Sequence, residues 1–147
     1  IIMKNNEYIK AYKKTQQSAN SITSSYEIIR SLIKELMNSM QKIALDIQDE
    51  RDSVNKSLFT DKSSIKDNAS KKAKNISKSL SIIYGLQTCL DFDKAPDIAT
   101  NLFQLYEFCR QEIIKGFSQK NDSGIIKAIG IIKQILEGWE EMPSLIK

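Results

Sequence analysis

The sequence predicts an all-α protein, an antiparallel four-helix bundle with a short N-terminal helical segment. Only 5 of the 147 residues are glycine and 2 are proline, which is few for a protein built from many strands and turns. Apolar residues recur at steps of three and four in four long stretches, the spacing of one face of an α-helix. Four such helices joined by mostly short turns give an up-and-down bundle, and we expect residues 1–147 to form a single domain.

The N-terminal stretch is short and mostly polar. Tyr8, Ala11 and Tyr12 share one side of a helical turn or two. Helices below about 12–15 residues are marginal in isolation, so this segment must dock its tyrosines onto the body of the protein or remain mobile. We expect residues 1–20 to form a mobile N-terminal cap.

The first two long helices are predicted from their apolar spacing. The first starts within residues 23–25, which are good N-cap residues, and fades near residue 52. Residues 51–67 lose the helical period and predict a polar connection, and the second helix follows from about residue 67 to residue 90. The residues expected to face the core are Ile29, Leu32, Ile33, Leu36, Met40, Ile43 and Ile47, followed by Ala69, Ala73, Ile76, Leu80, Ile83 and Leu90.

An acidic corner separates the second helix from the third. Pro96 has no backbone N–H and a φ suited to a first helical turn, so it predicts a helix start. Asp91, Asp93 and Asp97 can cap that helix and complement its dipole.

The last two helices follow this corner. The third is expected over residues 96–118, and residues 121–124 break the pattern and cap the fourth. Their inward residues are expected to be Ile98, Leu102, Leu105, Cys109 and Ile113, then Ile125, Ile129, Ile132, Leu136 and Trp139.

The composition argues against catalysis. The chain has no histidine, which removes the commonest general base and metal ligand and leaves Cys89 and Cys109 without an imidazole to activate them. It has no glycine-rich loop that could hold a phosphate. Asp91 and Asp93 suggest a calcium loop only superficially, because the required glycine and glutamate are absent. We expect no enzyme activity, no cofactor and no metal.

Charge and hydropathy limit the classes of partner. Residues 51–78 hold 8 Lys or Arg against 3 Asp or Glu, but their one aromatic residue is Phe59. Nucleic-acid binding favours a basic face with interleaved aromatic groups, so we interpret this stretch as a solvated connection. No apolar run approaches the roughly 18 residues that a membrane span needs. We therefore expect a cytoplasmic protein that neither binds nucleic acid nor inserts into a membrane.

Several apolar residues fall outside the four predicted inward stripes. One interpretation is that they widen the core; the other is that they form an exposed groove for the amphipathic helix of a partner. The sequence leaves both interpretations open for Ile82, Leu86, Phe103, Ile126, Ile131 and Ile135.

The residues around the corner resemble the flagellar secretion chaperone family FliS. That family shows LD, an acidic and basic pair, a GG pair and then IAxNLxxLYxY. The corresponding residues here are Leu90-Asp91-Phe92-Asp93-Lys94 and Ile98-Ala99-x-Asn101-Leu102-x-x-Leu105-Tyr106-Glu107-Phe108. Ala95-Pro96 stands in place of the glycine pair.

Three further stretches extend the resemblance over most of residues 8–141, in the same order. Residues 11–15, AYKKT, are similar to the family's AYKQT, and residues 139–141 to its W-x-E. Residues 23–27, TSSYE, are similar to its TASPE, with Tyr26 in place of the proline.

The resemblance implies a chaperone that binds the C-terminal helices of flagellin in apolar surface grooves and prevents their polymerisation before type III flagellar secretion. It also implies the export apparatus and a co-chaperone as partners, and an N-terminal segment that cargo displaces. The alternative is a generic helical adaptor or regulatory protein that binds another protein's amphipathic helix. The residues expected to contact the partner are Tyr8, Tyr12, Ile82, Leu86, Leu102, Phe103, Leu105, Tyr106, Ile126, Ile131 and Ile135.

Overall fold

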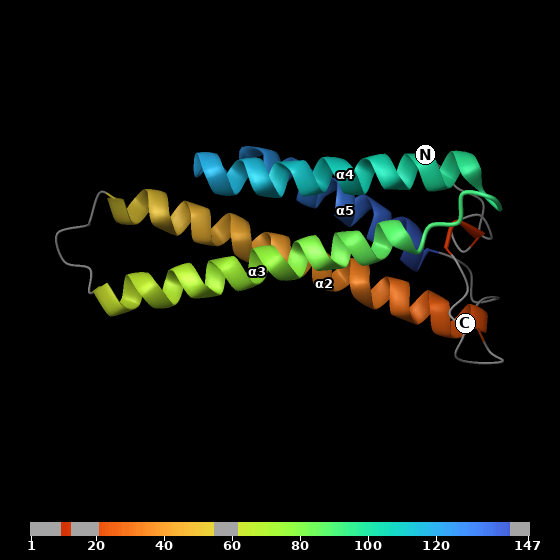
Figure 1. Cartoon of the computed structure of the whole chain (residues 1–147), viewed down its shortest axis with the longest axis horizontal. Coiled ribbons are helices and arrows are strands. Elements are labelled where there is room, and N and C mark those ends of the chain that lie inside the picture. Colours follow the sequence, from red (N-terminus) through yellow and green to blue (C-terminus); the bar gives the residue numbers. More distant parts are fainter. Residues whose placement is uncertain (1–9, 13–20, 55–61, 142–147) are drawn as a thin grey trace.

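The computed structural model describes residues 10–12, 21–54 and 62–141. Its four long helices are α2 (Ser21–Val54), α3 (Lys62–Thr88), α4 (Pro96–Gln119) and α5 (Ser123–Glu140), drawn in Figure 1. The described residues contain no strand, only one isolated bridge between Tyr12 and Leu90. The predicted all-α bundle is confirmed.

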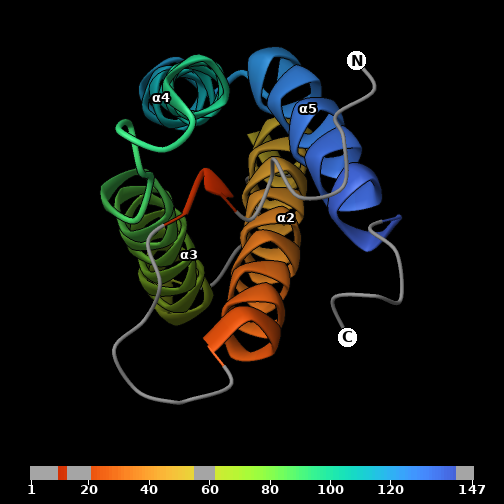
Figure 2. The ribbon, with the colours of Figure 1, turned by 90° about the vertical axis from the view of Figure 1, so that its right-hand side faces the viewer.

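The helices form a ring in which each packs mainly against two neighbours, and α2 also contacts α4 across it. The main contacts join α2 to α3 and α5, and α4 to α3 and α5. Figure 2 looks down the bundle and shows residues 10–12 lying among the four helices at its near end. The N-terminal segment therefore reaches the interior at one end of the bundle.

The predicted inward stripes form most of the core. Leu36, Met40, Ile43 and Ile47 of α2 are fully buried, as are Ile83 and Ile113 farther along the chain. Other predicted inward residues are only partly buried against this core, namely Leu32, Ile76, Leu80, Ile98, Leu105 and Ile129.

The prediction is wrong at the start of α3. The predicted connection of residues 51–67 is mostly helical, because α2 continues to Val54 and α3 begins at Lys62. Ala69 and Ala73 are exposed instead of inward, whereas Lys72 is buried between them in the sequence. The Lys72 ammonium lies 2.8 Å from Glu50 and 5.0 Å from the centre of the Phe117 ring. These contacts compensate the burial of the charge, and an alanine methyl has little apolar area to gain from burial.

Asp91 of the acidic corner stabilises the loop and does not cap the helix. The Asp91 carboxylate accepts hydrogen bonds from the main-chain N–H groups of Asp93 and Lys94, both at 3.1 Å. No side chain caps α4: the N-cap is Ala95, although Pro96 and Asp97 lie in the first turn as predicted. The Asp91 carboxylate thus binds within its own turn, whereas the Asp97 charge in the first turn complements the dipole of α4.

The junction of α4 and α5 is tight and tied to α2. Lys120 has a left-handed φ of 53°, and the Asn121 carboxamide oxygen accepts from the Ser123 N–H at 3.0 Å. Asp122 accepts a 2.6 Å hydrogen bond from Gln48 and forms a 2.9 Å ion pair with Arg51. The hydrogen bond from Gln48 is the largest of the causes that hold the pKa of Asp122 below its usual range.

Candidate partner-binding site

The candidate site is the place where residues 10–12 enter the bundle. We call it the seat; it is formed by Tyr26, Leu90, Asp91, Tyr106 and Trp139. Ala11 is fully buried there and Tyr12 is 5% exposed. Such burial is unusual for a short polar segment and requires contacts with the helices around it. Tyr8 lies outside the described residues.

The backbone of the segment is held at the corner between α3 and α4. The Asp91 N–H donates a 2.6 Å hydrogen bond to the Ala11 carbonyl, and Tyr12 forms an antiparallel bridge with Leu90. Lys10 is helical, and the chain is extended at Tyr12, where the bridge forms. The corner offers a main-chain donor just after α3 ends, and the extended segment satisfies it.

The Tyr12 side chain makes two specific contacts. Its hydroxyl shares a buried hydrogen bond with the Tyr106 hydroxyl of α4. Its ring meets Trp139 of α5 edge-on, with the ring centres 5.5 Å apart and the planes at 88°. Edge-to-face aromatic pairs contribute about 0.5–1.5 kcal/mol beyond their buried area. Tyr12 therefore links the segment to α4 and α5 together.

Tyr26 and Trp139 form the wall behind Tyr12. Their rings stack at 5.5 Å with an interplanar angle of 14°. The Tyr26 hydroxyl donates to the Trp139 carbonyl at 3.2 Å, and the Trp139 indole N–H donates to the Tyr26 carbonyl at 3.1 Å. Burial raises the pKa of the Tyr26 hydroxyl above its usual range. The pair joins α2 to α5 and fixes one side of the seat.

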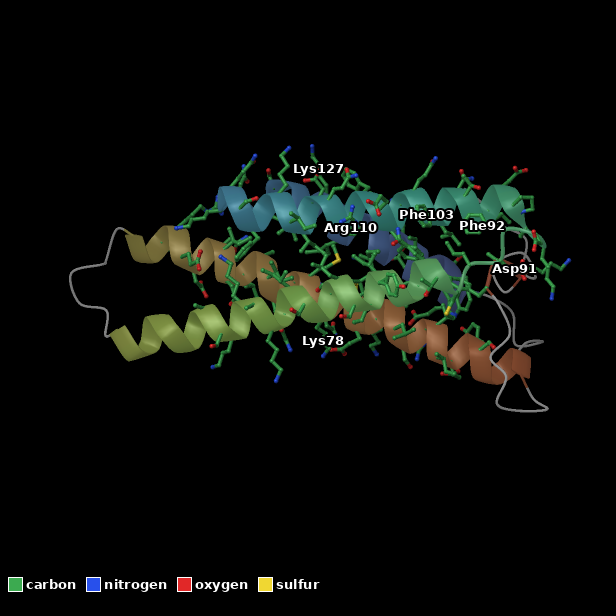
Figure 3. All side chains as sticks on the ribbon, in the orientation of Figure 1. Lys78, Asp91, Phe92, Phe103, Arg110 and Lys127 are labelled. Carbon is green, nitrogen blue, oxygen red and sulfur yellow. The ribbon has the colours of Figure 1, made fainter. Side chains whose placement is uncertain are left out.

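The other predicted contact residues do not lie on one surface. Leu86, Leu102, Tyr106 and Ile135 are buried in the core, so for Leu86 and Ile135 the structure supports a widened core stripe. Ile82, Leu105 and Ile131 are partly buried. Phe103 and Ile126 are 39% and 49% exposed, and Figure 3 shows Phe103 beside Phe92 on the outside of the bundle.

Sequence reasoning missed several residues of the seat. Tyr26, Leu90 and Trp139 contact or flank the segment, although none was predicted to contact a partner. All three lie in stretches that resemble the family pattern, which was the signal that could have found them. The spacing of residues within each helix could not have found them, because the seat is formed by residues of different helices.

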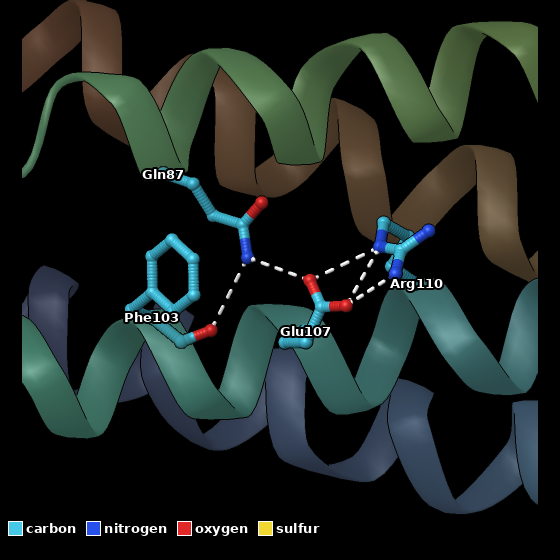
Figure 4. A network of polar contacts seen from close by, with 4 residues as sticks. All are labelled: Gln87, Phe103, Glu107 and Arg110. Atoms are coloured by element: carbon cyan, nitrogen blue, oxygen red, sulfur yellow. Dashed lines mark hydrogen bonds and ion pairs between the residues drawn. The ribbon is translucent and has the colours of Figure 1, made fainter.

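A polar network closes α3 against α4 near the seat (Figure 4). Gln87, buried on α3, donates to the Phe103 carbonyl at 3.3 Å and to the Glu107 carboxylate at 3.2 Å. The Glu107 carboxylate also accepts hydrogen bonds from the Arg110 guanidinium, whose Nε lies 2.9 Å from one carboxylate oxygen. These donors, Arg110 first, lower the pKa of Glu107 to about 2. The carboxylate is therefore charged and fully engaged at neutral pH.

Comparison with known proteins identifies the family. A sequence profile described as "Flagellar protein FliS" matches residues 8–145, nearly the whole chain. The chain belongs to the FliS family. The matched range contains the buried segment, the corner and Trp139, so the seat is built entirely from the part of the chain that the family profile covers.

Two curated relatives of the family resemble part of the chain. The Flagellar secretion chaperone FliS of Vibrio cholerae is 37% identical over 73 residues, 49% of this chain and 53% of the relative. The Flagellar secretion chaperone FliS of Salmonella typhimurium is 33% identical over 73 residues, 48% of this chain and 53% of the relative. The similarity therefore spans about half the length of each curated relative.

The described residues give two further results. Among them, no group of three or more His, Cys, Asp or Glu side chains is placed to hold a metal ion. No helix in the described part of the chain is long and apolar enough to cross a membrane.

Proposed function

We propose that this protein is a non-enzymatic, cytoplasmic flagellar export chaperone that binds the C-terminal helices of flagellin. Binding would cover apolar helix faces that otherwise polymerise, until the export apparatus receives the cargo. Membership of the FliS family supports the chaperone role, and both relatives carry the name "Flagellar secretion chaperone". The single observation that carries the mechanism is the burial of Ala11 and Tyr12 in the seat.

The seat supports a mechanism of exchange. Burying a tyrosine removes about 150–250 Å² from water, worth about 4–6 kcal/mol at about 25 cal/mol per Å². Ordering each backbone residue costs about 1–2 kcal/mol, so the cost for residues 10–12 is of similar size. We infer that the docked state of this segment is favoured by little enough for a cargo to displace it. A cargo helix with more apolar area can then replace it.

The groups that contact residues 10–12 are of the kinds that can bind an incoming cargo chain. Displacement of residues 10–12 would remove their contacts with the Leu90 backbone, the Trp139 ring, the Tyr106 hydroxyl and the Asp91 N–H. These combine apolar contact with a donor and a hydroxyl for the cargo backbone or side chains. We infer that together they contribute to a surface for an amphipathic helix.

The test uses the only tryptophan of the chain as a reporter. The C-terminal helical fragment of the host's flagellin is titrated into the full-length protein, and Trp139 emission is followed. Because Tyr12 contacts the Trp139 ring, displacement of the segment should change the emission as binding saturates. No binding at micromolar concentration would contradict the proposed function.

A pair of variants tests the exchange itself. Tyr12→Ala weakens docking of the segment and should tighten flagellin binding, because less docking energy must be overcome. Tyr84→Ala is the control, since Tyr84 is 70% exposed on α3, and it should leave the affinity unchanged. Weaker binding by Tyr12→Ala, with an unchanged helical circular dichroism spectrum, would show that the segment contacts the cargo instead of giving way to it.

A further inference from the structure

The boundary between α3 and α4 is the least extensive of the four main helix contacts in the ring. Residues 10–12 depend on both sides of this boundary. Their backbone is held where α3 ends, and the Tyr12 hydroxyl is bonded to Tyr106 of α4. Figure 2 shows the segment inside the ring, next to the end of α3. The spacing of α3 and α4 at this end therefore decides whether both sets of contacts can form at once.

Gln87 joins the two helices at this end. It is the penultimate residue of α3 and only 9% exposed. Its side-chain Nε2 donates to the Phe103 carbonyl at 3.3 Å and to the Glu107 carboxylate at 3.2 Å, as Figure 4 shows. A carboxamide nitrogen carries two hydrogens, so both bonds can form together. One side chain of α3 thus holds a main-chain and a side-chain acceptor of α4.

Both ends of this contact are directly connected to the seat. The Gln87 carbonyl accepts a 3.3 Å hydrogen bond from the N–H of Leu90, the residue that pairs with Tyr12. On α4, Tyr106 immediately precedes Glu107 in the sequence. A change in the distance between Gln87 and Glu107 therefore moves Leu90 relative to Tyr106, and these two residues hold Tyr12 from opposite sides.

The acceptor on α4 is itself held in place. The Arg110 guanidinium donates to the Glu107 carboxylate, which restricts its rotation before Gln87 binds it. A side chain that is already ordered loses less conformational entropy when it forms a further hydrogen bond. Hydrogen bonds to a charged carboxylate are also stronger than those between neutral groups. Both effects favour a firm contact between Gln87 and Glu107.

A second polar contact between α3 and α4 lies far from the seat. The Lys72 ammonium of α3 is 5.0 Å from the centre of the Phe117 ring of α4. Lys72 precedes Gln87 by 15 residues, which is roughly 22 Å along a helix that rises about 1.5 Å per residue. Lys72 is too distant to fix the spacing of the helices at the seat. Of these two contacts, only the one made by Gln87 can do so.

We propose that Gln87 is a positioning residue of the seat. Its bonds to α4 fix the spacing between Leu90 and Tyr106 and thereby set how firmly residues 10–12 stay docked. The docking of this segment does not depend on the identity of a cargo, so the inference can be tested apart from the proposed function. Its consequence for exchange rests on the proposed function: Gln87 would set how easily a cargo replaces the segment.

The test compares hydrogen exchange at two main-chain amides of the full-length protein. The Asp91 N–H donates to the Ala11 carbonyl and reports docking of the segment. The N–H of Ile43, which is fully buried within α2, reports opening of the bundle. Gln87→Met keeps the length of the side chain and removes both donors. We expect exchange at Asp91 to become about three- to tenfold faster, beyond any change at Ile43, as the loss of a hydrogen bond of ordinary net strength predicts.

A control and a rescue accompany this variant. Gln104→Met makes the same substitution at an exposed position of α4 and should leave exchange at Asp91 unchanged. Gln87→Glu sets a second carboxylate against Glu107, and the repulsion should also accelerate exchange at Asp91. Adding Glu107→Gln to Gln87→Glu restores a bond between carboxamide and carboxylate with the donor on the other helix, and exchange should slow again. Circular dichroism melting checks that each variant is folded.

The outcomes separate a positioning role from a general structural one. Unchanged exchange at Asp91 in Gln87→Met would overturn the proposal. Equal acceleration at Asp91 and Ile43 would overturn it too, because Gln87 would then stabilise the whole bundle without a particular effect on the seat. The absence of rescue in the double variant would show that this hydrogen bond does not position the seat. A wild type that fails to bind the flagellin fragment would contradict the proposed function and would leave the role of Gln87 to be decided by the exchange rates.

Discussion

The hydroxyl groups of Tyr12 and Tyr106 share a buried hydrogen bond across 94 residues of sequence. Tyr12 belongs to a segment of three described residues, and Tyr106 lies in the middle of the fully formed helix α4. The bond therefore joins the N-terminal segment to helix α4. It helps determine how firmly the seat is occupied.

Tyr106→Phe should loosen the segment without disturbing the bundle. The substitution keeps the ring and removes a hydroxyl that takes part in a buried hydrogen bond, so we expect a loss of about 1 kcal/mol in the free energy of unfolding. The docked state should also become less populated. Hydrogen exchange at the Asp91 N–H measures this directly, because that group donates to the Ala11 carbonyl.

Tyr84→Phe is the matched control for this prediction. It removes the same hydroxyl from a side chain that is 70% exposed on α3, and exchange at Asp91 should not change. If exchange at Asp91 is equally slow in Tyr106→Phe and in the wild type, the hydroxyl pair does not hold the segment.

The sequence predicted the helices and most of the core because these depend on local spacing. The apolar steps of α2 match buried residues such as Leu36 and Ile43 closely, and those of α4 do so at Leu102, Cys109 and Ile113. The spacing alone could not show whether Leu86 and Ile135 widen the core or line an exposed groove. Their burial depends on how each helix is rotated toward its neighbours, and the sequence of one helix alone does not determine that rotation.

The start of α3 illustrates a second limit. Hydropathy places alanines inside and lysines outside, yet Lys72 is buried and Ala73 is exposed. The Lys72 side chain buries its long aliphatic stem while its ammonium contacts Glu50 and the Phe117 ring. Those partners lie on α2 and α4, so their contribution is visible only once the helices are packed.

The seat shows the same limit for function. Its groups come from the N-terminal segment, the corner, and the helices α2, α4 and α5. Only the resemblance to a family placed these distant stretches in one functional unit. Physical reasoning on the sequence predicted that Tyr12 must dock or stay mobile, but it could not supply the surface on which Tyr12 lies.

Two glycines in helices should respond to alanine in opposite directions. A Cβ at Gly116 would lie 2.6 Å from Ile125 Cδ1 and 2.8 Å from the Asn121 carbonyl oxygen. Because the backbone oxygen cannot move aside easily, Gly116→Ala should destabilise the fold by about 1–3 kcal/mol. At Gly130 a Cβ meets nothing within 4 Å, and Gly130→Ala should stabilise by about 0.5–1 kcal/mol.

Urea denaturation of both glycine variants measures these changes, and each serves as the control for the other. The shared loss of backbone entropy in the unfolded state cancels in the comparison. A gain in stability at Gly116 would mean that α4 and α5 can separate at their junction without cost, contrary to the close packing described above.

The Glu107 network should make stability depend on acid pH. Hydrogen bonds from Arg110, then Gln87, lower the pKa of Glu107 from 4.5 to about 2. Between these values the unfolded chain binds a proton that the folded chain does not, so folding loses stability as pH falls through this window. Glu107→Gln cannot titrate. Its stability deficit relative to the wild type should be largest at neutral pH and shrink from about pH 4.5 toward pH 2, as measured by urea denaturation.

Asp46 supplies a control of opposite sign for this prediction. Burial, followed by the nearby Asp49, raises the pKa of Asp46 above 3.8, so its charge destabilises the folded state at neutral pH. Asp46→Asn should therefore be more stable than the wild type at pH 7, and this advantage should vanish as pH falls below about 3.8.

If the Glu107→Gln deficit stays constant from pH 7 to pH 2, the Glu107 carboxylate contributes through its shape and not through its charge. The charge of Glu107 would then contribute nothing to its hydrogen bond with Gln87, which joins α4 to α3.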